Sequence, residues 1–216
     1  EYDQLGRQIA ANDPNTGVRS VVYDDSGNIA VVTDGRYSTI GLAMGTAYDA
    51  LDRPLLREVR RNTTVSGTTL SGGTPMERTF YWYDVDPATF PGAALACAFN
   101  NLGRLSRVAQ WLDLGGVLTE VSRKEFCYDD RGRVDKMVHV IGGQTYAYAY
   151  EYGSADQVLK QWYPDGDVVT TEYDAAGRVV RTRNVAGPLL AASHARADGL
   201  PVRRELGNGA AKQRFC

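Results

Sequence analysis

Few side chains in this sequence could carry covalent or acid–base chemistry. They are two histidines, His139 and His194, and three cysteines, Cys97, Cys127 and Cys216. Cys127 could pair as a nucleophile with His139 as its base, but packing of Cys127 inside a strand explains it more simply. No HExxH, GxSxG, P-loop or GxGxxG pattern occurs in the chain. We therefore assign no catalytic residue and expect a protein that is not an enzyme.

The same residue types give little reason to expect a metal or a cofactor. Three cysteines without CxxC spacing make a disulfide framework unlikely, and a zinc site less likely still. Asp84 with Asp86, and Asp165 with Asp167, are short acidic pairs of low specificity for calcium. We expect neither a resident metal nor a cofactor, and the cysteines indicate no particular redox compartment.

Charge and hydropathy exclude two broad classes of protein. The chain has 24 basic and 26 acidic side chains and a formal net charge of −2. This balance argues against a nucleic-acid partner, which requires clustered basic charge opposite the phosphates. No apolar run approaches the roughly 18 residues of a membrane-spanning helix. The best run, residues 93–99, is far too short, so we expect no membrane span in this segment.

A six-residue motif, Tyr-Asp-x-x-Gly-Arg, recurs along the chain and accounts for its unusual composition. There are 13 Tyr against 5 Phe, and 23 Gly against 8 Pro. Three copies are complete, and others keep part of the pattern. The motif residues that we single out are Tyr2, Asp3, Gly6, Arg7, Tyr23, Asp24, Gly27, Tyr48, Asp49, Arg53, Gly103, Arg104, Tyr128, Asp129, Gly132, Arg133, Tyr173, Asp174, Gly177 and Arg178.

The partial copies depart from the motif in different ways. Residues 23–28 lose only the Arg, residues 48–53 lose only the Gly, residues 99–104 keep the Gly-Arg end, and residues 152–157 keep only the Tyr. The stretch from Tyr83 and Asp84 to Gly103 and Arg104 looks like a copy with an expanded turn. His194 stands where the spacing places the next Tyr, so we interpret that copy as degenerate.

The spacing and chemistry of the motif predict a β-hairpin. Copies about 20–25 residues apart can hold two strands and two turns. Tyr would end a strand, and Asp would accept hydrogen bonds from backbone N–H groups two residues further on. Gly would supply the positive φ of a tight turn, and Arg would begin the return strand. The flanks alternate as strands do, with Tyr146, Tyr148, Tyr150 and Tyr152 on one face.

These signals predict an all-β fold of consecutive antiparallel β-hairpins. Residues 62–75 and 84–99 interrupt the period, and we expect both stretches to project from the sheet. Neither resembles an interdomain linker, so residues 1–216 are interpreted as a single repeat segment. Both ends fall at a repeat boundary, and we expect a fragment of a longer protein.

Each class of motif residue has a structural and a functional interpretation. The tyrosine rows could stack on a sugar, but cross-strand aromatic packing is the simpler explanation. The arginines could bind anions, but they more simply pair with Asp or stack on Tyr of an adjacent hairpin. The aspartates could bind calcium, but capping of their own turns is the simpler explanation.

The Tyr-Asp motif, together with Trp-Tyr-Pro-Asp-Gly at residues 162–166 and Gly-Asn-Gly at 207–209, resembles the Rhs/YD-repeat proteins over essentially the whole chain. In Tc-toxin B–C components, bacterial Rhs toxins and teneurins, such repeats form a long sheet that spirals into a hollow shell. In the bacterial members the shell encloses a C-terminal toxic domain. The self-cleaving aspartates that close some of these shells have no match in this chain.

The resemblance implies a non-enzymatic structural scaffold, secreted or at the cell surface, in a polymorphic or Tc-type toxin. Its partners would be the flanking repeats and an encapsulated C-terminal domain of the same polypeptide or complex. Two alternatives remain open: an extracellular adhesion or interaction module, and a carbohydrate-binding β-protein. A fragment with open sheet edges is also expected to associate edge to edge with itself.

Overall fold

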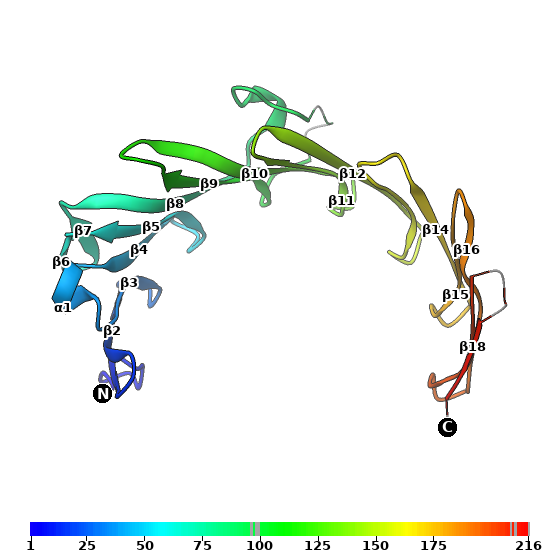
Figure 1. The fold of residues 1–216 in the computed structure, drawn as a ribbon, viewed down its shortest axis with the longest axis horizontal. Coiled ribbons are helices and arrows are strands. Elements are labelled where there is room, and N and C mark those ends of the chain that lie inside the picture. The colour runs from blue at the N-terminus through cyan, green and yellow to red at the C-terminus, as the bar shows by residue number, and fades with distance from the viewer. Residues whose placement is uncertain (96, 98–99, 208, 210, 216) are drawn as a thin grey trace. The chain divides into compact units, whose positions relative to one another are not determined.

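Alternating β-branched and aromatic residues form strands that follow one another in the order of the chain. The computed structural model describes residues 1–95, 97, 100–207, 209 and 211–215. Over these residues the chain is almost entirely β, which confirms the predicted all-β fold of consecutive antiparallel hairpins (Figure 1). The described elements are β1 (Ala10–Asp13), β2 (Gly17–Tyr23), β3 (Ile29–Thr33), α1 (Tyr37–Ile40), β4 (Ala43–Tyr48), β5 (Pro54–Arg61), β6 (Thr64–Ser66), β7 (Thr69–Ser71), β8 (Thr74–Tyr83), the 3-10 helix η1 (Pro87–Thr89), β9 (Leu105–Asp113), β10 (Leu118–Tyr128), β11 (Val134–Ile141), β12 (Gln144–Tyr152), β13 (Val158–Trp162), β14 (Val168–Tyr173), β15 (Val179–Asn184), β16 (Gly187–Ala195), β17 (Pro201–Leu206) and β18 (Ala211–Arg214).

The sheet order is sequential because short turns join neighbouring strands. Among the described residues, β1 to β5 and β8 to β18 form one sixteen-stranded sheet in chain order, and β6 and β7 form a separate pair. The pairing register shifts by one residue just before a tyrosine at five hairpin ends. A three-residue hairpin loop with a left-handed third residue produces such a bulge. The tyrosines at these bulges are Tyr23, Tyr48, Tyr83, Tyr152 and Tyr173.

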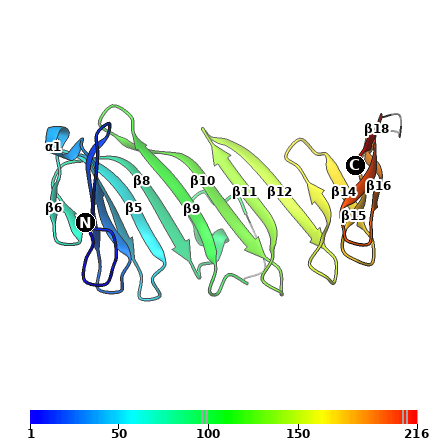
Figure 2. The same cartoon turned by 90° about the horizontal axis from the view of Figure 1, so that it is seen from below.

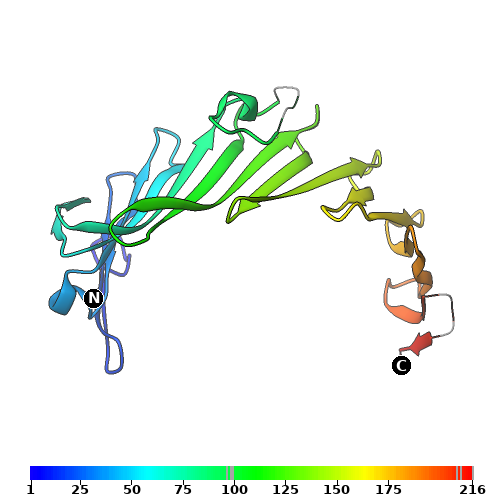
Figure 3. The ribbon, with the colours of Figure 1, turned by 45° about the horizontal axis from the view of Figure 1, so that its top comes forward.

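The chain divides into two compact units. The first comprises Glu1–Asp86, Asn101–Lys124 and Val140–Gly143, and the second comprises Pro87–Asn100, Glu125–His139 and Gln144–Cys216. Figure 2 shows β5, β8 and β9 of the first unit side by side. Figure 3 shows β14 to β18 of the second unit following one another from yellow to red.

An aromatic cluster lies on one face of the first unit. Phe80 stacks on Trp82 with ring centroids 5.7 Å apart, and it meets Trp111 edge-on at 6.5 Å. The guanidinium of Arg107 lies 5.4 Å from the Trp82 ring centroid and forms an ion pair of 3.0 Å with Glu120. Arg107 is only 7% exposed, and pairing offsets the cost of burying its charge. The cluster therefore combines apolar packing with an internal ion pair.

Residues 62–75 do not project from the sheet, so that prediction was wrong. They contain the hairpin β6–β7, which folds back over β3 and β4. Leu70 packs on Gly45, where an added Cβ would lie only 3.1 Å from the Leu70 side chain. The backbone N–H of Val65 donates a hydrogen bond of 3.1 Å to the Tyr37 hydroxyl. This apolar contact outweighs the polar, loop-like composition of the stretch.

The second interruption is also fixed, in part by a disulfide that the cysteine spacing did not predict. Cys97 and Cys127 are bonded across a sequence separation of 30 residues, with their Cα atoms 5.7 Å apart. The expectation that a disulfide framework is unlikely is therefore corrected for this pair. Phe99, which begins one partial motif copy, lies outside the described residues. Within the described chain, no helix is long and apolar enough to span a membrane.

Candidate functional site

The aspartate of the motif closes its own turn with five hydrogen bonds. In the copy at residues 173–178, the Asp174 N–H donates to the Arg178 carbonyl at 2.9 Å, and the Gly177 N–H donates to the Asp174 carbonyl at 2.9 Å. Oδ1 of Asp174 accepts from the N–H groups of Ala176 and Arg178 at 2.9 and 3.0 Å. Oδ2 accepts from Nε of Arg178 at 2.7 Å. The carboxylate therefore fixes both the loop and the arginine.

This arrangement repeats wherever the motif has both Asp and Arg in a short turn. The same Nε–Oδ2 distance of 2.7 Å recurs in three other copies, and so do the backbone bonds that close the turn. The pairs are Asp3 with Arg7, Asp49 with Arg53, and Asp129 with Arg133. The oxygens of these carboxylates thus accept hydrogen bonds from backbone N–H groups and from arginine side chains of the protein itself.

The turn lowers the pKa of its aspartates. Backbone hydrogen bonds from Arg7, Arg53 and Arg178 are the largest cause, since they stabilise the ionised carboxylate. The side-chain bond from the same arginine lowers the pKa further, while desolvation opposes both effects. The carboxylates are therefore acceptors that remain ionised, rather than general acids.

The position of the motif glycine requires a left-handed backbone. Gly177 has φ of 77°, which side chains with a Cβ seldom adopt. Two copies place Asp there instead, Asp52 with φ of 59° and Asp156 with φ of 63°. Aspartate tolerates this conformation better than most residues. The other motif glycines are Gly6, Gly27, Gly103 and Gly132, all with positive φ.

One turn that looked strongly degenerate in sequence has the same backbone geometry as the others. In residues 152–157 the Gly153 N–H donates to the Gln157 carbonyl at 2.8 Å, and the Asp156 N–H donates to the Gly153 carbonyl at 3.2 Å. Gly and Asp have exchanged places relative to the motif. The signal that could have revealed this turn is an Asp, rather than a Gly, at the left-handed position.

The next degenerate copy begins one residue later than predicted. The Arg196 N–H donates to the Leu200 carbonyl at 2.9 Å, and the Gly199 N–H donates to the Arg196 carbonyl at 3.0 Å. Ala195, and not His194, therefore occupies the tyrosine position. A change of turn register by one residue explains the error, because spacing between repeats is not constant.

Asparagine takes the place of arginine in the second copy and keeps the hydrogen bonds to the aspartate of its own turn. Asn28 donates to Asp24 through its backbone N–H at 2.7 Å and through Nδ2 at 3.2 Å. Nδ2 of Asn28 also lies 2.8 Å from Oδ1 of Asp52 in the following turn. The Asp-closed turn thus persists without a guanidinium.

The expanded turn retains one closing bond of a short turn and replaces the other with a bond to the Asp84 side chain. The Asp84 N–H donates to the Arg104 carbonyl at 3.1 Å, and the Gly103 N–H donates to Oδ1 of Asp84. Tyr83 pairs with Leu105 across the two strands. The chain between these positions is a long insertion into an otherwise standard motif.

Successive turns are coupled by a contact between Arg and the Tyr of the next copy, which we call the Arg–Tyr ladder. The guanidinium carbon lies over the ring centroid at 4.3 to 4.5 Å, a geometry typical of cation–π attraction. The described pairs of the ladder are Arg7–Tyr23, Arg53–Tyr83 and Arg133–Tyr152.

A hydrogen bond from the tyrosine reinforces this coupling. The Tyr23 hydroxyl donates to the Gln8 carbonyl at 3.0 Å, and the Tyr152 hydroxyl donates to the Val134 carbonyl at 2.7 Å. In each case the acceptor directly follows the arginine of the preceding turn. Tyr48 and Tyr173 donate to the corresponding carbonyls of Ile29 and Val158, each at 3.0 Å. These four tyrosines therefore hold the chain segment before their own strand.

The motif arginines also reach polar groups of the following turn. Arg53 contacts Asp84 at 2.8 Å, and Arg133 contacts Asp156 at 2.6 Å. Arg178, whose next copy has Ala195 instead of Tyr, donates to the Arg196 carbonyl at 2.9 Å. Arg104 donates to the Leu102 carbonyl. Tyr128 ends β10, and Tyr2 forms an isolated bridge with Gln8.

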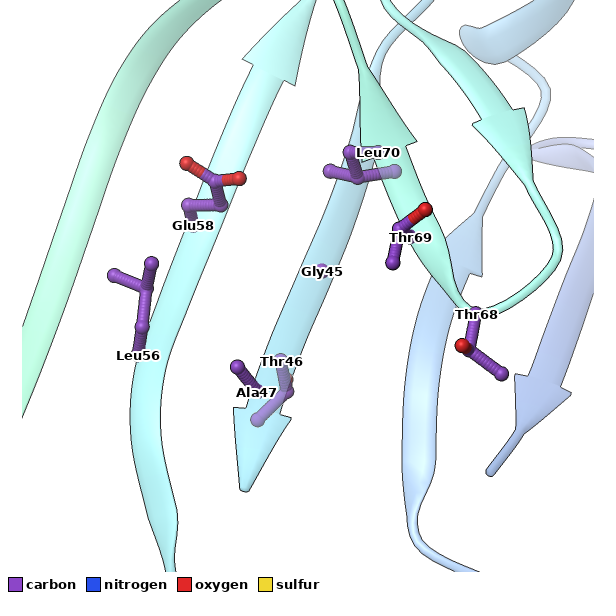
Figure 4. A pocket seen from close by; sticks show the side chains of 8 residues that line it. All are labelled: Gly45, Thr46, Ala47, Leu56, Glu58, Thr68, Thr69 and Leu70. Atoms are coloured by element: carbon purple, nitrogen blue, oxygen red, sulfur yellow. The ribbon is translucent and has the colours of Figure 1, made fainter. Parts of the chain in front are cut away.

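The hollow between β4, β5 and the hairpin β6–β7 is a poor ligand site. It has a volume of about 220 Å³ and is lined by Gly45, Thr46, Ala47, Leu56, Glu58, Thr68, Thr69 and Leu70 (Figure 4). Its one carboxylate, Glu58, lies 2.9 Å from Nε of Arg60 and 3.0 Å from Nε of Arg78. Because both oxygens face arginines, Glu58 presents little free charge to a ligand.

Cys127, which was considered as a nucleophile, and Asp84 and Asp167, which were considered as calcium ligands, make structural contacts. Cys127 is in a disulfide, so its sulfur is not a thiol nucleophile in this state. Asp84 contacts Arg53 and the Gly103 N–H, and Asp167 accepts from Nδ2 of Asn184 at 2.9 Å. The arrangement supports repeat-to-repeat coupling more than it supports a reaction.

Comparison with known protein families identifies part of this repetitive sequence. The model of the family described as RHS Repeat matches residues 152–188. This stretch is an RHS repeat. It contains the turn at Gly153 and the complete Tyr173 motif. The RHS resemblance drawn from the motif is thereby confirmed over residues 152–188.

Solved structures similar to the chain include Tc toxin assemblies, all at low identity. TcdB2-TccC3 without its hypervariable C-terminal region is 13% identical, with a TM-score of 0.43 over 95% of this chain and 13% of that one. TcdB2-TccC3 is 14% identical, with a TM-score of 0.41 over 95% and 13%. The Photorhabdus luminescens Tc holotoxin pore is 15% identical, with a TM-score of 0.37 over 96% and 12%. This chain thus spans about an eighth of those chains, and no curated protein matches it.

Proposed function

We propose that this chain is a non-enzymatic wall segment of an Rhs-type shell that encloses a C-terminal toxic domain of the same polypeptide or complex. The observation that carries the proposal is the coupling of successive turns through the Arg–Tyr ladder within each unit. A wall must keep its strands in register over many repeats, and each ladder contact links one hairpin to the next. The RHS match over residues 152–188 supports the same role.

The sheet can accept further repeats at both edges. Among the described strands, β1 pairs only with β2, and β18 pairs only with β17. Flanking hairpins of a longer polypeptide would satisfy the outward backbone groups of β18, and at β1 they would take the place of the bonds that Glu1 makes with Ala10. In this proposal residues 1–216 form one repeat segment of a secreted or surface-exposed toxin, and the motif residues are structural.

Protease protection of the C-terminal domain in the complete polypeptide tests the enclosing role. The intact protein is treated with a broad-specificity protease, and survival of the region that follows the repeats is followed by mass spectrometry. We expect that region to persist, and we expect Arg53→Ala with Arg133→Ala to expose it. Arg183→Ala, at an exposed strand position, is the matched control. Rapid digestion of the C-terminal region in the unmodified protein would contradict enclosure.

A specific observation supports carbohydrate binding as a second candidate function. A hollow of about 380 Å³ is lined by Thr145, Tyr146, Tyr163, Pro164 and Asp165. Tyr146 is 41% exposed, and exposed aromatic faces beside a carboxylate suit sugar rings. A glycan array comparing the unmodified chain with Tyr146→Ala tests this function. Binding that is absent, or that is unchanged in the variant, would exclude this hollow as a sugar site.

A further inference from the structure

One turn of the second unit has the arginine of the Arg–Tyr ladder, but the copy that follows it has alanine at the tyrosine position. Two contacts establish that Ala195 is equivalent to a ladder tyrosine. It pairs across a register shift with the first residue of β17, as Tyr152 pairs with the first residue of β13. Nη1 of Arg178 donates to the carbonyl after Ala195 at 2.9 Å, as Nη1 of Arg133 donates to the carbonyl after Tyr152 at 3.2 Å. Ala195 therefore places a methyl group where a ladder copy places a phenol ring.

A hollow with a volume of about 260 Å³ lies at this position. Its lining includes Asp174, Arg178, Val179 and Ala195. The side chain of Arg178 is 37% exposed, whereas those of the three ladder arginines are 22–32% exposed. The substitution of a ring by a methyl group thus leaves the Arg178 guanidinium more accessible than its counterparts.

The guanidinium of Arg178 is held in a fixed orientation. Its Nε donates to Oδ2 of Asp174 at 2.7 Å, and its Nη1 donates to the Arg196 carbonyl. Hydrogen bonds of a guanidinium lie in its plane, so its faces remain available for stacking on a ring. In the ladder a tyrosine ring uses such a face, with its centroid 4.3 to 4.5 Å from the guanidinium carbon.

The same hollow includes the residue that would accept a hydrogen bond from a phenol. In the ladder, the tyrosine hydroxyl donates to the carbonyl of the residue after the arginine, at 3.0 Å to Gln8 and at 2.7 Å to Val134. The equivalent residue after Arg178 is Val179, which lines the hollow. A molecule with one aromatic ring and one hydroxyl donor would therefore match both contacts.

The size of the hollow suits a ligand with a single ring. A protein cavity of about 150 Å³ is large enough to bind benzene, whereas sites for drug-sized ligands begin at about 300 Å³. At about 260 Å³ the hollow beside Arg178 lies between these limits. A sugar ring fits the contacts less well, because it has no π face to attract the guanidinium.

We propose that the hollow between Arg178 and Ala195 is a binding site for a free, single-ring phenol. The ring stacks on the Arg178 guanidinium, and the hydroxyl donates to the Val179 carbonyl. The ligand thereby makes the contacts that a ladder tyrosine makes elsewhere in the chain. The inference does not depend on the proposed shell function, because it concerns only contacts around two successive turns.

Three ligands test the proposal on the whole unmodified chain. The probe is p-cresol, which has the ring, hydroxyl and first carbon of a tyrosine side chain, and binding is measured by saturation-transfer NMR titration. Toluene lacks the hydroxyl, and 4-methylanisole has the oxygen but cannot donate. We expect both to bind roughly two- to tenfold more weakly than p-cresol, the factor for one hydrogen bond. No saturable binding of p-cresol, or equal binding of p-cresol and 4-methylanisole, would overturn the proposal.

A variant that supplies the ring from the chain itself locates the site. Ala195→Tyr should abolish p-cresol binding and raise the melting temperature by a few degrees, because its ring would complete the ladder at Arg178. Leu189→Tyr adds a tyrosine at an exposed position of the same strand, β16, and should leave p-cresol binding unchanged. Undiminished binding in Ala195→Tyr would overturn the proposal, because the ligand would then lie elsewhere. The ligand comparison on the unmodified chain decides the question if the variant fails to fold.

A further ligand distinguishes a free phenol from a tyrosine of another polypeptide. N-acetyl-tyrosine amide has the same ring and hydroxyl but also a peptide backbone on both sides. We expect p-cresol to bind at least as tightly as this amide, because both ladder contacts come from the ring and the hydroxyl. Binding of the amide without binding of p-cresol would overturn the proposal and would assign the hollow to a partner's tyrosine instead.

Discussion

The guanidinium carbon of Arg133 lies 4.5 Å from the ring centroid of Tyr152, and the Tyr152 hydroxyl donates to the carbonyl that directly follows Arg133. The two residues are therefore joined twice, once through the ring face and once through the backbone. Arg133 also ion-pairs with Asp129 of its own turn. One arginine thus connects the closure of its own turn to the position of the next hairpin.

Arg133→Lys should weaken this connection although it keeps the charge. An ammonium cannot present a planar face to the Tyr152 ring while it binds Oδ2 of Asp129 and Oδ1 of Asp156, as Arg133 does. We expect the melting temperature to fall by a few degrees, measured by circular dichroism. The control is Arg183→Lys, at an exposed strand position. Equal melting of the variant and the parent would mean that planarity is unimportant in the ladder.

Gly177→Val should destabilise the hairpin between β14 and β15. The glycine has φ of 77°, and a β-branched residue forced into that region costs about 1–3 kcal/mol. Urea unfolding measures the difference. Gly177→Asp should cost less, because Asp52 and Asp156 occupy the equivalent place with positive φ. Valine tolerated as well as aspartate would show that the backbone at residue 177 is not left-handed.

Acid should remove the contribution of the turn carboxylates. The pKa of Asp174 is held below its ordinary value of 3.8, chiefly by the backbone hydrogen bond from Arg178. A depressed folded-state pKa means that the stabilisation is complete at pH values above the unfolded pKa and is lost as the pH falls through the folded one. Asp174→Asn should therefore lower the free energy of unfolding at pH 6 and match the parent near pH 2. A difference that persists undiminished into acid would contradict this assignment.

The open edges should make the isolated chain associate with itself. The Phe215 N–H bonds the Val202 carbonyl of β17, so by alternation the N–H groups of Lys212 and Arg214 point away from that strand. Lys212→Pro removes an outward donor without breaking an existing pairing bond. Sedimentation velocity should show concentration-dependent oligomers that the variant reduces. A monomer at all concentrations for the parent would argue against edge pairing.

The sequence predicts turn geometry well where the chemistry is local. An Asp that caps its own loop, a Gly in the left-handed region and an Arg that returns the chain all act within six residues. The turn at Gly153 was interpreted as strongly degenerate because Asp156, and not a glycine, occupies its left-handed position. The copy at Ala195 was misplaced because repeat length varies, and spacing alone cannot fix the register.

Contacts between distant parts of the chain could not be predicted in this way. Leu70 packs on Gly45 because a hairpin folds back, and no periodicity in residues 62–75 encodes that contact. The Cys97–Cys127 bond joins an insertion to a strand, so the spacing of the cysteines gave no signal. Stacking of Arg on a Tyr of an adjacent hairpin was one of the structural roles expected from the sequence. Only the coordinates show that each Arg of the ladder stacks on the Tyr of the following copy.

The expanded turn has a practical consequence for protein engineering. Asp84 and Arg104 keep the outer closing bond of the motif although residues 85–103 separate them, and the Gly103 N–H bonds the Asp84 side chain. A turn that keeps its closure across such an interruption is a permissive site for grafting foreign sequence. The other Asp-closed turns offer the same backbone frame, so a reporter or a binding peptide placed between Asp and Gly of any one of them should leave the flanking strands in register.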